Sequence, residues 1–294
     1  FKLGKRLTRP IHELVDMSKR ISQGEYGIKL PERRRDELGA LMLSMNSMSE
    51  GLFNKKQVEE IFSRYVSPKV ADKVLSNIKQ VKIGGEVREA SVLFADVISF
   101  TSLSEKLEPE RLSNLLNEYF DLIARAASAY NGNVDKYVGD CAMLVFGVPE
   151  NDPHHTMHAI SCALLIKHLV QNYNKIAKNH NQPTLSFHIG VNSGEMLAGN
   201  IGAQERMEYT VVGDSVNLAS RLSRSSKNND VIVSGIVINK YKLDDKIVGE
   251  AIDTIYLRGK TEETTIYRIL GLKDPYQTEL NKKVKELLNA PICN

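Results

Sequence analysis

The sequence lacks tryptophan and has only three cysteines among its 294 residues. Cys141, Cys162 and Cys293 are odd in number and do not have the spacing of a metal-binding motif, which favours a reducing compartment over a disulfide framework. The formal net charge is only +3, so we expect no nucleic-acid partner. No apolar run approaches the roughly 20 residues that a membrane-spanning helix needs. What remains is an ordinary globular composition, with 42% hydrophobic and 26% charged residues.

Basic residues gather at the beginning of the chain. Lys2, Lys5, Arg6 and Arg9 lie within the first ten residues, and no acidic residue accompanies them. The chain begins at Phe1 rather than at Met, which indicates a fragment of a longer protein. Basic clusters are typical of the cytoplasmic flank of a membrane helix. We therefore expect a tether through a missing N-terminal transmembrane segment, and a location on the cytoplasmic side of the cell membrane; a solvated charge cluster is the alternative.

Apolar residues recur at helical spacing in two stretches of the N-terminal part. The second stretch has the a/d rhythm of a coiled coil, and such a narrow stripe needs a partner helix to bury it. Between the stretches, residues 24–31 contain two glycines and a proline, which predict a non-helical connector. Pro10 is expected in the first turn of the first helix. The two apolar sets are Ile11, Leu14, Met17 and Ile21, and then Leu38, Leu41, Met45, Met48 and Leu52.

The helix–connector–helix of residues 1–53 resembles a HAMP domain. The resemblance rests on Arg9-Pro10 at the start, Gly24 opening the connector, and Asp36-Glu37-Leu38-Gly39 opening the second helix. It implies a parallel four-helix bundle in a dimer, which relays signals from a membrane segment to an output domain. A generic dimerising helical hairpin is the alternative. Residues 54–86 are expected to form a helical, signal-transducing linker that is interrupted at Pro68.

The next part of the chain predicts an α+β fold. The expected order is a ferredoxin-like βαββαβ sheet with helices on one face. Gly139-Asp140, between two runs rich in β-formers, predicts a tight hairpin with a carboxylate at its tip. Asp96 ends an upstream strand, so the two aspartates together predict a site for Mg²⁺ and a phosphate substrate. The expected elements are a strand at about 90–96, a helix at 109–130, strands at 133–138 and 141–147, a helix at 153–179 and a strand at 185–192.

A further motif begins at Gly213, directly after a strand that ends at Val212. Asp214 or Ser215 can cap the helix that follows. Within that helix Asn217 and Arg221 are four residues apart, so both side chains project from one face. An amide suits a ribose and a guanidinium suits a phosphate.

Three of these motifs together resemble the class III nucleotidyl cyclase domain, over residues 87–272 with 273–294 as a C-terminal tail. They are the segment 94–101, the hairpin of Lys136 and Asp140, and the segment 209–221. By this resemblance the side chains of Asp96 and Asp140 and the backbone carbonyl of Val97 bind metal.

The resemblance also assigns the nucleotide contacts. Lys136 and Thr210 contact the purine, and a lysine at this position favours ATP over GTP. Asn217 orients the ribose, and Arg221 stabilises the transition state. Backbone N–H groups of Ser99, Phe100 and Thr101 are available to phosphate oxygens, and Arg258 or Lys260 neutralises the terminal phosphates.

The implied reaction converts ATP to 3′,5′-cyclic AMP and pyrophosphate, with two Mg²⁺ or Mn²⁺ ions in each active site. In the family the metal aspartates come from one subunit and the remaining residues from the other. This chain has both sets, which implies a homodimer with two shared sites, regulated through the N-terminal domain by an upstream membrane or sensor segment. A guanylate cyclase, or a catalytically dead cyclase domain that only relays or dimerises, is the alternative.

Other features lead to weaker hypotheses. His154 and His158 are spaced for zinc, but with no Cys or carboxylate ligand nearby, capping and solvent contact are favoured. Residues 190–194 and 199–202 are glycine-rich without the helix of a dinucleotide fingerprint, which predicts hairpin turns. The C-terminal stretch 280–288 predicts a short amphipathic helix or a disordered tail.

Overall fold

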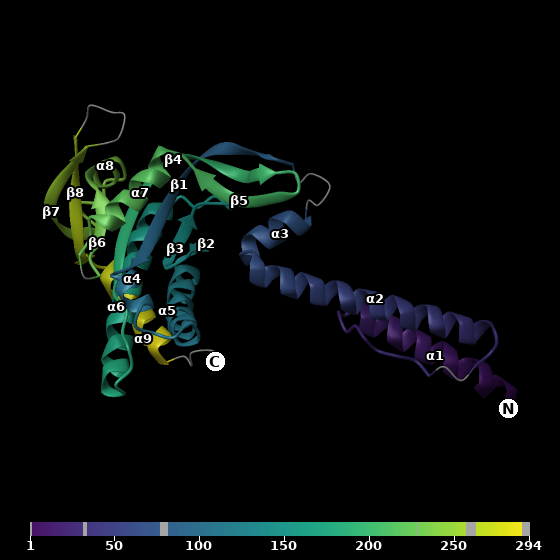
Figure 1. Cartoon of the computed structure of the whole chain (residues 1–294). Coiled ribbons are helices and arrows are strands. Elements are labelled where there is room, and N and C mark those ends of the chain that lie inside the picture. The colour runs from purple at the N-terminus through teal and green to yellow at the C-terminus, as the bar shows by residue number, and fades with distance from the viewer. Residues whose placement is uncertain (1, 32–33, 77–81, 228, 257–262, 290–294) are drawn as a thin grey trace. The chain divides into compact units, whose positions relative to one another are not determined.

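The computed structural model of the chain describes residues 2–31, 34–76, 82–227, 229–256 and 263–289. The chain forms two compact units, Phe1–Ala71 and Asp72–Asn294, each of which is described by itself (Figure 1). Within the described ranges, no helix is both long and apolar enough to cross a membrane.

The first unit is a pair of helices joined by a connector. Helix α1 spans Lys2–Ser22 and helix α2 spans Glu37–Tyr65. Pro10 lies inside α1 rather than in its first turn, so this expectation was wrong. Its side chain is buried, and that burial offsets part of the cost of the missing N–H bond. Among its described side chains, the hairpin buries those of Pro10, Leu14, Met17, Met42, Asn46 and Ser49.

Polar side chains of α2 hold the connector. The Leu30 N–H donates to Asn46 Oδ1 at 2.7 Å, and Asn46 Nδ2 donates to the Leu30 carbonyl at 2.9 Å. The Gly27 N–H donates to Ser49 Oγ at 3.1 Å. The side-chain amide of Asn46 thus pairs with the backbone of Leu30 as a neighbouring strand would. It satisfies an N–H and a carbonyl of the connector that have no helical partner.

Both ends of α2 follow the sequence signals. Asp36 is the N-cap, and its side chain accepts from the Gly39 N–H at 3.0 Å. The helix continues without interruption beyond residue 53 to Tyr65, where Val66 leaves the helical region. Pro68 then opens helix α3, which spans Pro68–Ser76, as expected for a proline in a first turn.

The second unit is built on one large sheet. Its strands have the order β2-β3-β1-β4-β6-β8-β7, and β5 pairs with β4 beyond the end of β6. The first four strands are antiparallel neighbours in the order 4-1-3-2, so the ferredoxin-like prediction is confirmed. The strands are β1 (Gly84–Val97), β2 (Asn133–Val138), β3 (Cys141–Phe146), β4 (Phe187–Ala203), β5 (Arg206–Val212), β6 (Val231–Ser234), β7 (Ile247–Tyr256) and β8 (Glu263–Leu272).

Helices cover both faces of this sheet. Leu93, Ala95 and Val97 of β1 point toward one face, into the core formed with α5 (Pro109–Ala129) and α6 (His155–Asn179). Val92 and Phe94 point the opposite way, toward α7 (Asp214–Arg224). The expectation of helices on one face therefore holds for α5 and α6 but not for α7. Two short helices, α4 (Phe100–Ser104) and α8 (Gly235–Lys240), complete the unit together with α9 (Tyr276–Asn289).

The glycines at 190–194 and at 199 lie inside strand β4, so the prediction of hairpin turns there was wrong. Gly190 pairs with Phe94 of β1, and Gly199 pairs with Gly85. A Cβ on Gly190 would lie 2.2 Å from the Ser223 nitrogen of α7. These glycines allow another backbone to approach the strand closely, which is the second meaning of glycine in a β pattern.

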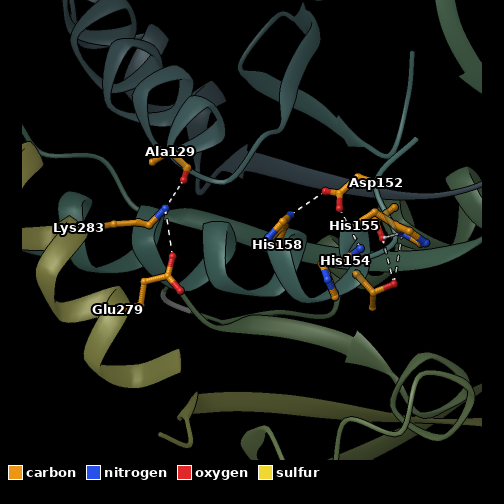
Figure 2. Close-up of polar contacts among 9 residues, drawn as sticks. Ala129, Asp152, His154, His155, His158, Glu279 and Lys283 are labelled. Carbon is orange, nitrogen blue, oxygen red and sulfur yellow. Dashed lines mark hydrogen bonds and ion pairs between the residues drawn. The ribbon is translucent and has the colours of Figure 1, made fainter. Parts of the chain in front are cut away.

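Of the two alternatives for the C-terminal stretch 280–288, the helix is confirmed, and helix α9 packs against the sheet unit. Leu280 of α9 is fully buried in the main core. Lys283 donates to the carbonyl of Ala129 at the end of α5 and forms a 3.3 Å ion pair with Glu279 (Figure 2). Arg125 of α5 in turn donates to the Leu287 carbonyl at 2.7 Å. Each helix thus satisfies a C-terminal carbonyl of the other.

Candidate active site

Two carboxylates meet where strands β1 and β3 begin to diverge. Asp96 of β1 pairs with Cys141 of β3, and Asp140 precedes Cys141 in the two-residue turn after β2. The Val97 N–H donates to the Asp140 carbonyl at 3.3 Å, which joins the turn to the end of β1. The predicted Gly139-Asp140 hairpin is confirmed, and Gly139 has the positive φ of 62° that such a turn favours.

The nearby carboxylates of Asp96 and Asp140 affect the pKa values of acidic groups at this corner. Burial raises the pKa of Asp140, and the neighbouring charge of Asp96 raises it further. Burial, together with Asp96 and then Asp140, raises the pKa of the Cys141 thiol to about 12, so the thiol stays protonated. Two neighbouring carboxylates repel each other when both are ionised, so a cation between them is favourable.

Asp96 and Asp140 supply the hard oxygen donors that Mg²⁺ and Mn²⁺ prefer, so the residues present fit a divalent ion. Throughout the described ranges, no group of three His, Cys, Asp or Glu residues could hold a metal ion. An ion at this corner therefore needs further oxygens, and Mg²⁺ commonly takes them from backbone, water and substrate phosphates. The Val97 carbonyl at the end of β1 is the predicted backbone ligand.

The loop after β1 carries the predicted phosphate contacts. Ser99 adopts a left-handed conformation with φ 58° and is the N-cap of the five-residue helix α4, with no side-chain cap bond. Positive φ is uncommon outside glycine and often marks a functional turn. Ser99 and Thr101 are exposed and Phe100 is half-buried, so the phosphate role of this loop stays a prediction.

A β-bulge organises a second corner, on strand β2. Val134 is opposite Leu144 and Lys136 is opposite the next residue, Met143, so Asp135 is the extra residue. A bulge sends two successive side chains toward one side of a sheet, against the usual alternation. Asp135 and Lys136 both reach strand β5.

The partners of the bulge on β5 are Glu208 and Thr210, which lie two residues apart on one face of that strand. Thr210 Oγ1 donates to Asp135 Oδ2 at 2.7 Å. Lys136 Nζ forms a short ion pair with Glu208 and lies 3.6 Å from Asp135 Oδ2. Lys136 and Thr210, which the sequence predicts as purine contacts, are thus brought together by two carboxylates that the prediction did not include.

Burial governs the charges at this corner. The Asp135 side chain is 2% exposed, and burial raises its pKa against the opposing effects of Thr210 and Lys136. Burial lowers the pKa of Lys136, but Glu208 and Asp135 outweigh it, so the net shift is upward and the ammonium stays charged. The Lys136 ion pair in turn lowers the pKa of Glu208, whose side chain is 53% exposed.

Helix α7 begins directly after β5 and carries the other predicted residues. Its N-cap is Gly213, without a side-chain cap bond, so capping by Asp214 or Ser215 is not observed. Asn217 is exposed and Arg221 is half-buried, one turn apart. The opposite face of α7 is buried against the sheet, chiefly through Leu218, Ala219, Leu222 and Ser223.

Arg224 was missed by the sequence prediction. It follows Asn217 and Arg221 at i+7 and i+3, on the same exposed stripe of α7. Its charge lowers the pKa of Cys141, against the larger effects of burial and of Asp96. The spacing of Asn217, Arg221 and Arg224 at i, i+4 and i+7 could have indicated from the sequence that Arg224 lies on the same side of the helix.

Two other sequence hypotheses concern the phosphate contacts of Arg258 or Lys260 and the pair of histidines at the start of α6. Arg258 and Lys260 lie outside the described residues. His158 Nδ1 contacts Asp152 Oδ2 at 2.6 Å, so a carboxylate does lie near the histidines, contrary to expectation (Figure 2). Asp152 also accepts from the His154 N–H at 2.8 Å, so this carboxylate contacts both the start of helix α6 and His158.

Comparison with known proteins agrees with this geometry. Residues 85–271 match the family described as "Adenylate and Guanylate cyclase catalytic domain", and residues 2–53 match the HAMP domain. Adenylate cyclase 1 of Rhizobium meliloti is 27% identical over 272 residues, which cover 90% of this chain and 39% of that protein. The adenylate cyclase of Anabaena cylindrica is 29% identical and is covered over 55% of its length. The chain thus spans about half the length of these relatives or less.

Solved structures show the same fold. The adenylyl cyclase CyaB from P. aeruginosa aligns with a TM-score of 0.60 and 30% identity, over 65% of this chain and 98% of that one. The guanylyl cyclase Cya2 aligns with a TM-score of 0.61 and 28% identity, over 66% and 98%. Because the cyclase match spans more than half of the sequence, the chain belongs to the family of adenylate and guanylate cyclase catalytic domains, joined to a HAMP domain on its N-terminal side.

Proposed function

We propose that this chain is an adenylate cyclase, which converts ATP to 3′,5′-cyclic AMP and pyrophosphate at two shared sites of a homodimer. The observation that carries the proposal is the corner where Lys136 and Thr210 meet across strands β2 and β5. A charged amine and a hydroxyl lie together there, directly before the helix that carries Asn217 and Arg221.

The pattern of donors and acceptors favours adenine. Adenine presents an acceptor at N1 and an amino donor at position 6, whereas guanine presents an N1–H donor and a carbonyl acceptor. Lys136 donates only, and so suits the adenine N1. The Thr210 hydroxyl supplies an acceptor for the 6-amino group. A guanylate cyclase is the second candidate, because the guanylyl cyclase Cya2 has the same fold at 28% identity.

The remaining residues each have a separate role in an in-line displacement at the α-phosphorus. The ribose 3′-hydroxyl attacks the α-phosphorus, and pyrophosphate leaves. Asn217 holds the ribose, and Arg221 meets the charge that develops on the α-phosphoryl oxygens. Ser99, Phe100 and Thr101 offer backbone N–H groups to the phosphates. Asp96, Asp140 and the Val97 carbonyl would hold two Mg²⁺ or Mn²⁺ ions, which would acidify the hydroxyl and neutralise the charge of the triphosphate.

Within one chain, Lys136 and Thr210 are bonded to Glu208 and Asp135, whereas Asp96 and Asp140 act on each other and on Cys141. This division supports sites completed by a second copy of the chain. The helical hairpin supports a dimer as well, because it leaves Ile11, Val15, Leu41 and Met48 exposed. Paired hairpins would form a parallel four-helix bundle around these side chains.

Regulation by an upstream segment follows from the same proposal. The HAMP match and the basic first residues support a tether to the membrane and a location on its cytoplasmic side. Cyclic AMP production should change when residues 1–53 are removed. Unchanged activity would contradict control by the hairpin.

The decisive experiment compares turnover of ATP and GTP by the purified chain in the presence of Mn²⁺, with the cyclic products separated by chromatography. Cyclic AMP should dominate at equal substrate concentration. Dominant cyclic GMP would replace the proposal with a guanylate cyclase. No cyclic product from either substrate, in a folded dimer, would favour a domain that only relays or dimerises.

A further inference from the structure

The buried carboxylate of Asp135 has no part in the function proposed above, yet it is the most constrained acid of the nucleotide corner. The β-bulge turns its side chain inward from β2, where it is 2% exposed. The Thr210 hydroxyl donates to it at 2.7 Å, and Thr210 itself is 7% exposed. With both groups so nearly buried, water competes little for this hydrogen bond.

A hydroxyl on its own does not distinguish an amino group from a carbonyl. It has one hydrogen to donate and two lone pairs to accept with, and it rotates to suit its partner. An ionised carboxylate, by contrast, only accepts. When the Thr210 hydroxyl donates its hydrogen bond to Asp135, the hydroxyl has only its lone pairs left, and it can only accept a hydrogen bond from a ligand.

We infer that Asp135 is a positioning residue that holds the Thr210 hydroxyl as a hydrogen-bond acceptor, and that the site thereby selects purines with a 6-amino group over purines with a 6-carbonyl. This inference rests on the proposed function, because it requires Thr210 to face position 6 of the base. It adds that the discrimination resides in the Asp135–Thr210 pair rather than in the threonine alone.

Burial raises the pKa of Asp135, and the charge of Glu208 raises it further. The Thr210 hydroxyl and the Lys136 charge act in the opposite direction and favour the ionised form that this role requires. Lys136 Nζ lies 3.6 Å away, and the Thr210 hydroxyl donates to the carboxylate, so both oppose the cost of burial. Glu208, the other acid at this corner, is engaged by Lys136 and is mostly open to solvent. Asp135 is therefore the acid that is both buried and bonded to the hydroxyl.

The test substitutes Asp135→Asn in the full chain and measures kcat/KM for ATP and for inosine triphosphate, which carries a 6-carbonyl. Asparagine has nearly the same shape, but its amide can donate to Thr210 and so release the hydroxyl hydrogen toward the base. The preference for ATP over inosine triphosphate should fall by about tenfold, the value of one well-placed hydrogen bond. Lys136 is present in every variant, but Asp135→Asn also removes a carboxylate 3.6 Å from Lys136 Nζ, so the Thr210→Val background is needed to separate this effect from that of the hydroxyl.

Thr210 supplies the controls. Thr210→Val removes the hydroxyl and should reduce the preference, whereas Thr210→Ser keeps the hydroxyl and should retain it. In the Thr210→Val background, Asp135→Asn should change the ratio no further, because Asp135 acts through the hydroxyl. The thermal unfolding temperature of each variant is recorded in parallel.

Three results would overturn the inference. Asp135→Asn could lower activity on both nucleotides equally, which is the mark of a structural role. Asp135→Asn could also change the preference for ATP over inosine triphosphate as strongly in the Thr210→Val background as in the unsubstituted chain. If the asparagine variant does not fold, Thr210→Val alone decides, and full retention of the ATP preference would refute the inference. The proposed function fails separately, if the unsubstituted chain forms no cyclic AMP.

Discussion

The two units of this chain distribute their apolar residues in opposite ways. The sheet unit buries a continuous core on one face of its sheet and a second cluster under α7. The helical hairpin buries few side chains and leaves large apolar residues, among them Ile11, Leu41 and Met48, open to solvent. A unit with a core of its own can hold catalytic groups in place, whereas a unit with unburied stripes depends on a partner for stability.

The difference fits the roles that we propose for the two units. A hairpin that is stable only when paired changes its packing at small energetic cost, which suits a relay. The sheet unit holds its nucleotide corner by buried polar contacts such as Asp135–Thr210, which suit recognition. Five predictions sharpen or break this comparison, in order of decreasing effect.

The largest effect is expected from the residues of the sheet unit that we propose as catalytic. Arg221→Ala should lower cyclic AMP formation by about 10³-fold, since phosphoryl-transfer arginines contribute on that scale. Asp96→Ala should be similarly inactive through loss of a metal ligand. Neither should alter the association of the hairpins, which sedimentation can measure.

Mixing these two inactive chains tests the shared site directly. Half of randomly mixed dimers carry one of each, and each such dimer holds one intact site, so about a quarter of the activity should return. Absence of recovery in dimers shown to be mixed would mean that each chain completes its own site.

The next prediction compares the effect of truncating one buried apolar side chain in each unit. Met17 of the hairpin is 1% exposed and Leu164 of the sheet unit is fully buried. Truncation of either to alanine should cost about 2–5 kcal/mol. We expect Met17→Ala to abolish the hairpin's helical structure and its association, while Leu164→Ala lowers the unfolding temperature of a unit that still folds. Circular dichroism on both variants checks this, and equal tolerance in the two units would break the comparison.

A smaller effect is expected where α9 meets α5. Lys283→Met removes the bond to the Ala129 carbonyl and the 3.3 Å pair with Glu279. The sheet unit should lose about 1 kcal/mol, or about 2–4 °C in unfolding temperature. Lys282→Met is the matched control, because Lys282 is exposed and its 3.8 Å pair with Glu286 contributes little. Equal effects of the two substitutions would show that α9 adds no stability through Lys283.

The smallest effect concerns pH. Burial lowers the pKa of His155, whose Nδ1 lies 2.7 Å from Ser91 Oγ. The folded form thus binds fewer protons than the unfolded form, so this contribution to stability is present above the ordinary histidine pKa of about 6.5 and is lost as pH falls below it. His155→Gln should flatten the slope of unfolding temperature between about pH 7 and 5.5. An unchanged slope would exclude His155 as a source of acid sensitivity.

Local signals predicted the elements that local physics controls. The start of the second helix at Asp36-Glu37-Leu38-Gly39, the interruption at Pro68 and the Gly139-Asp140 turn each depend on a few neighbouring residues, and each was confirmed. The placement of α7 was not predictable in this way. Its contact with Gly190 joins residues about 30 positions apart in the chain, and the glycine looked like a turn until the strand around it was known.

The candidate site divides along the same line. Residue type and spacing indicated Asp96, Asp140, Asn217 and Arg221 as candidates, and the family resemblance added Lys136 and Thr210. Asp135 was missed, since alternation along a strand would turn its side chain away from Lys136, and a bulge leaves no mark in the sequence.

By itself, then, the sequence determined the family, the order of elements and the type of chemistry, all of which depend on short runs of residues. The tertiary structure alone decided which groups meet: the extra residue in β2 that turns Asp135 toward Thr210, and the glycines of β4 that admit α7. The physical reason is that periodicity and turn preference act between neighbours in the chain. Bulges and close backbone approaches are selected by packing between strands and helices that are distant in sequence.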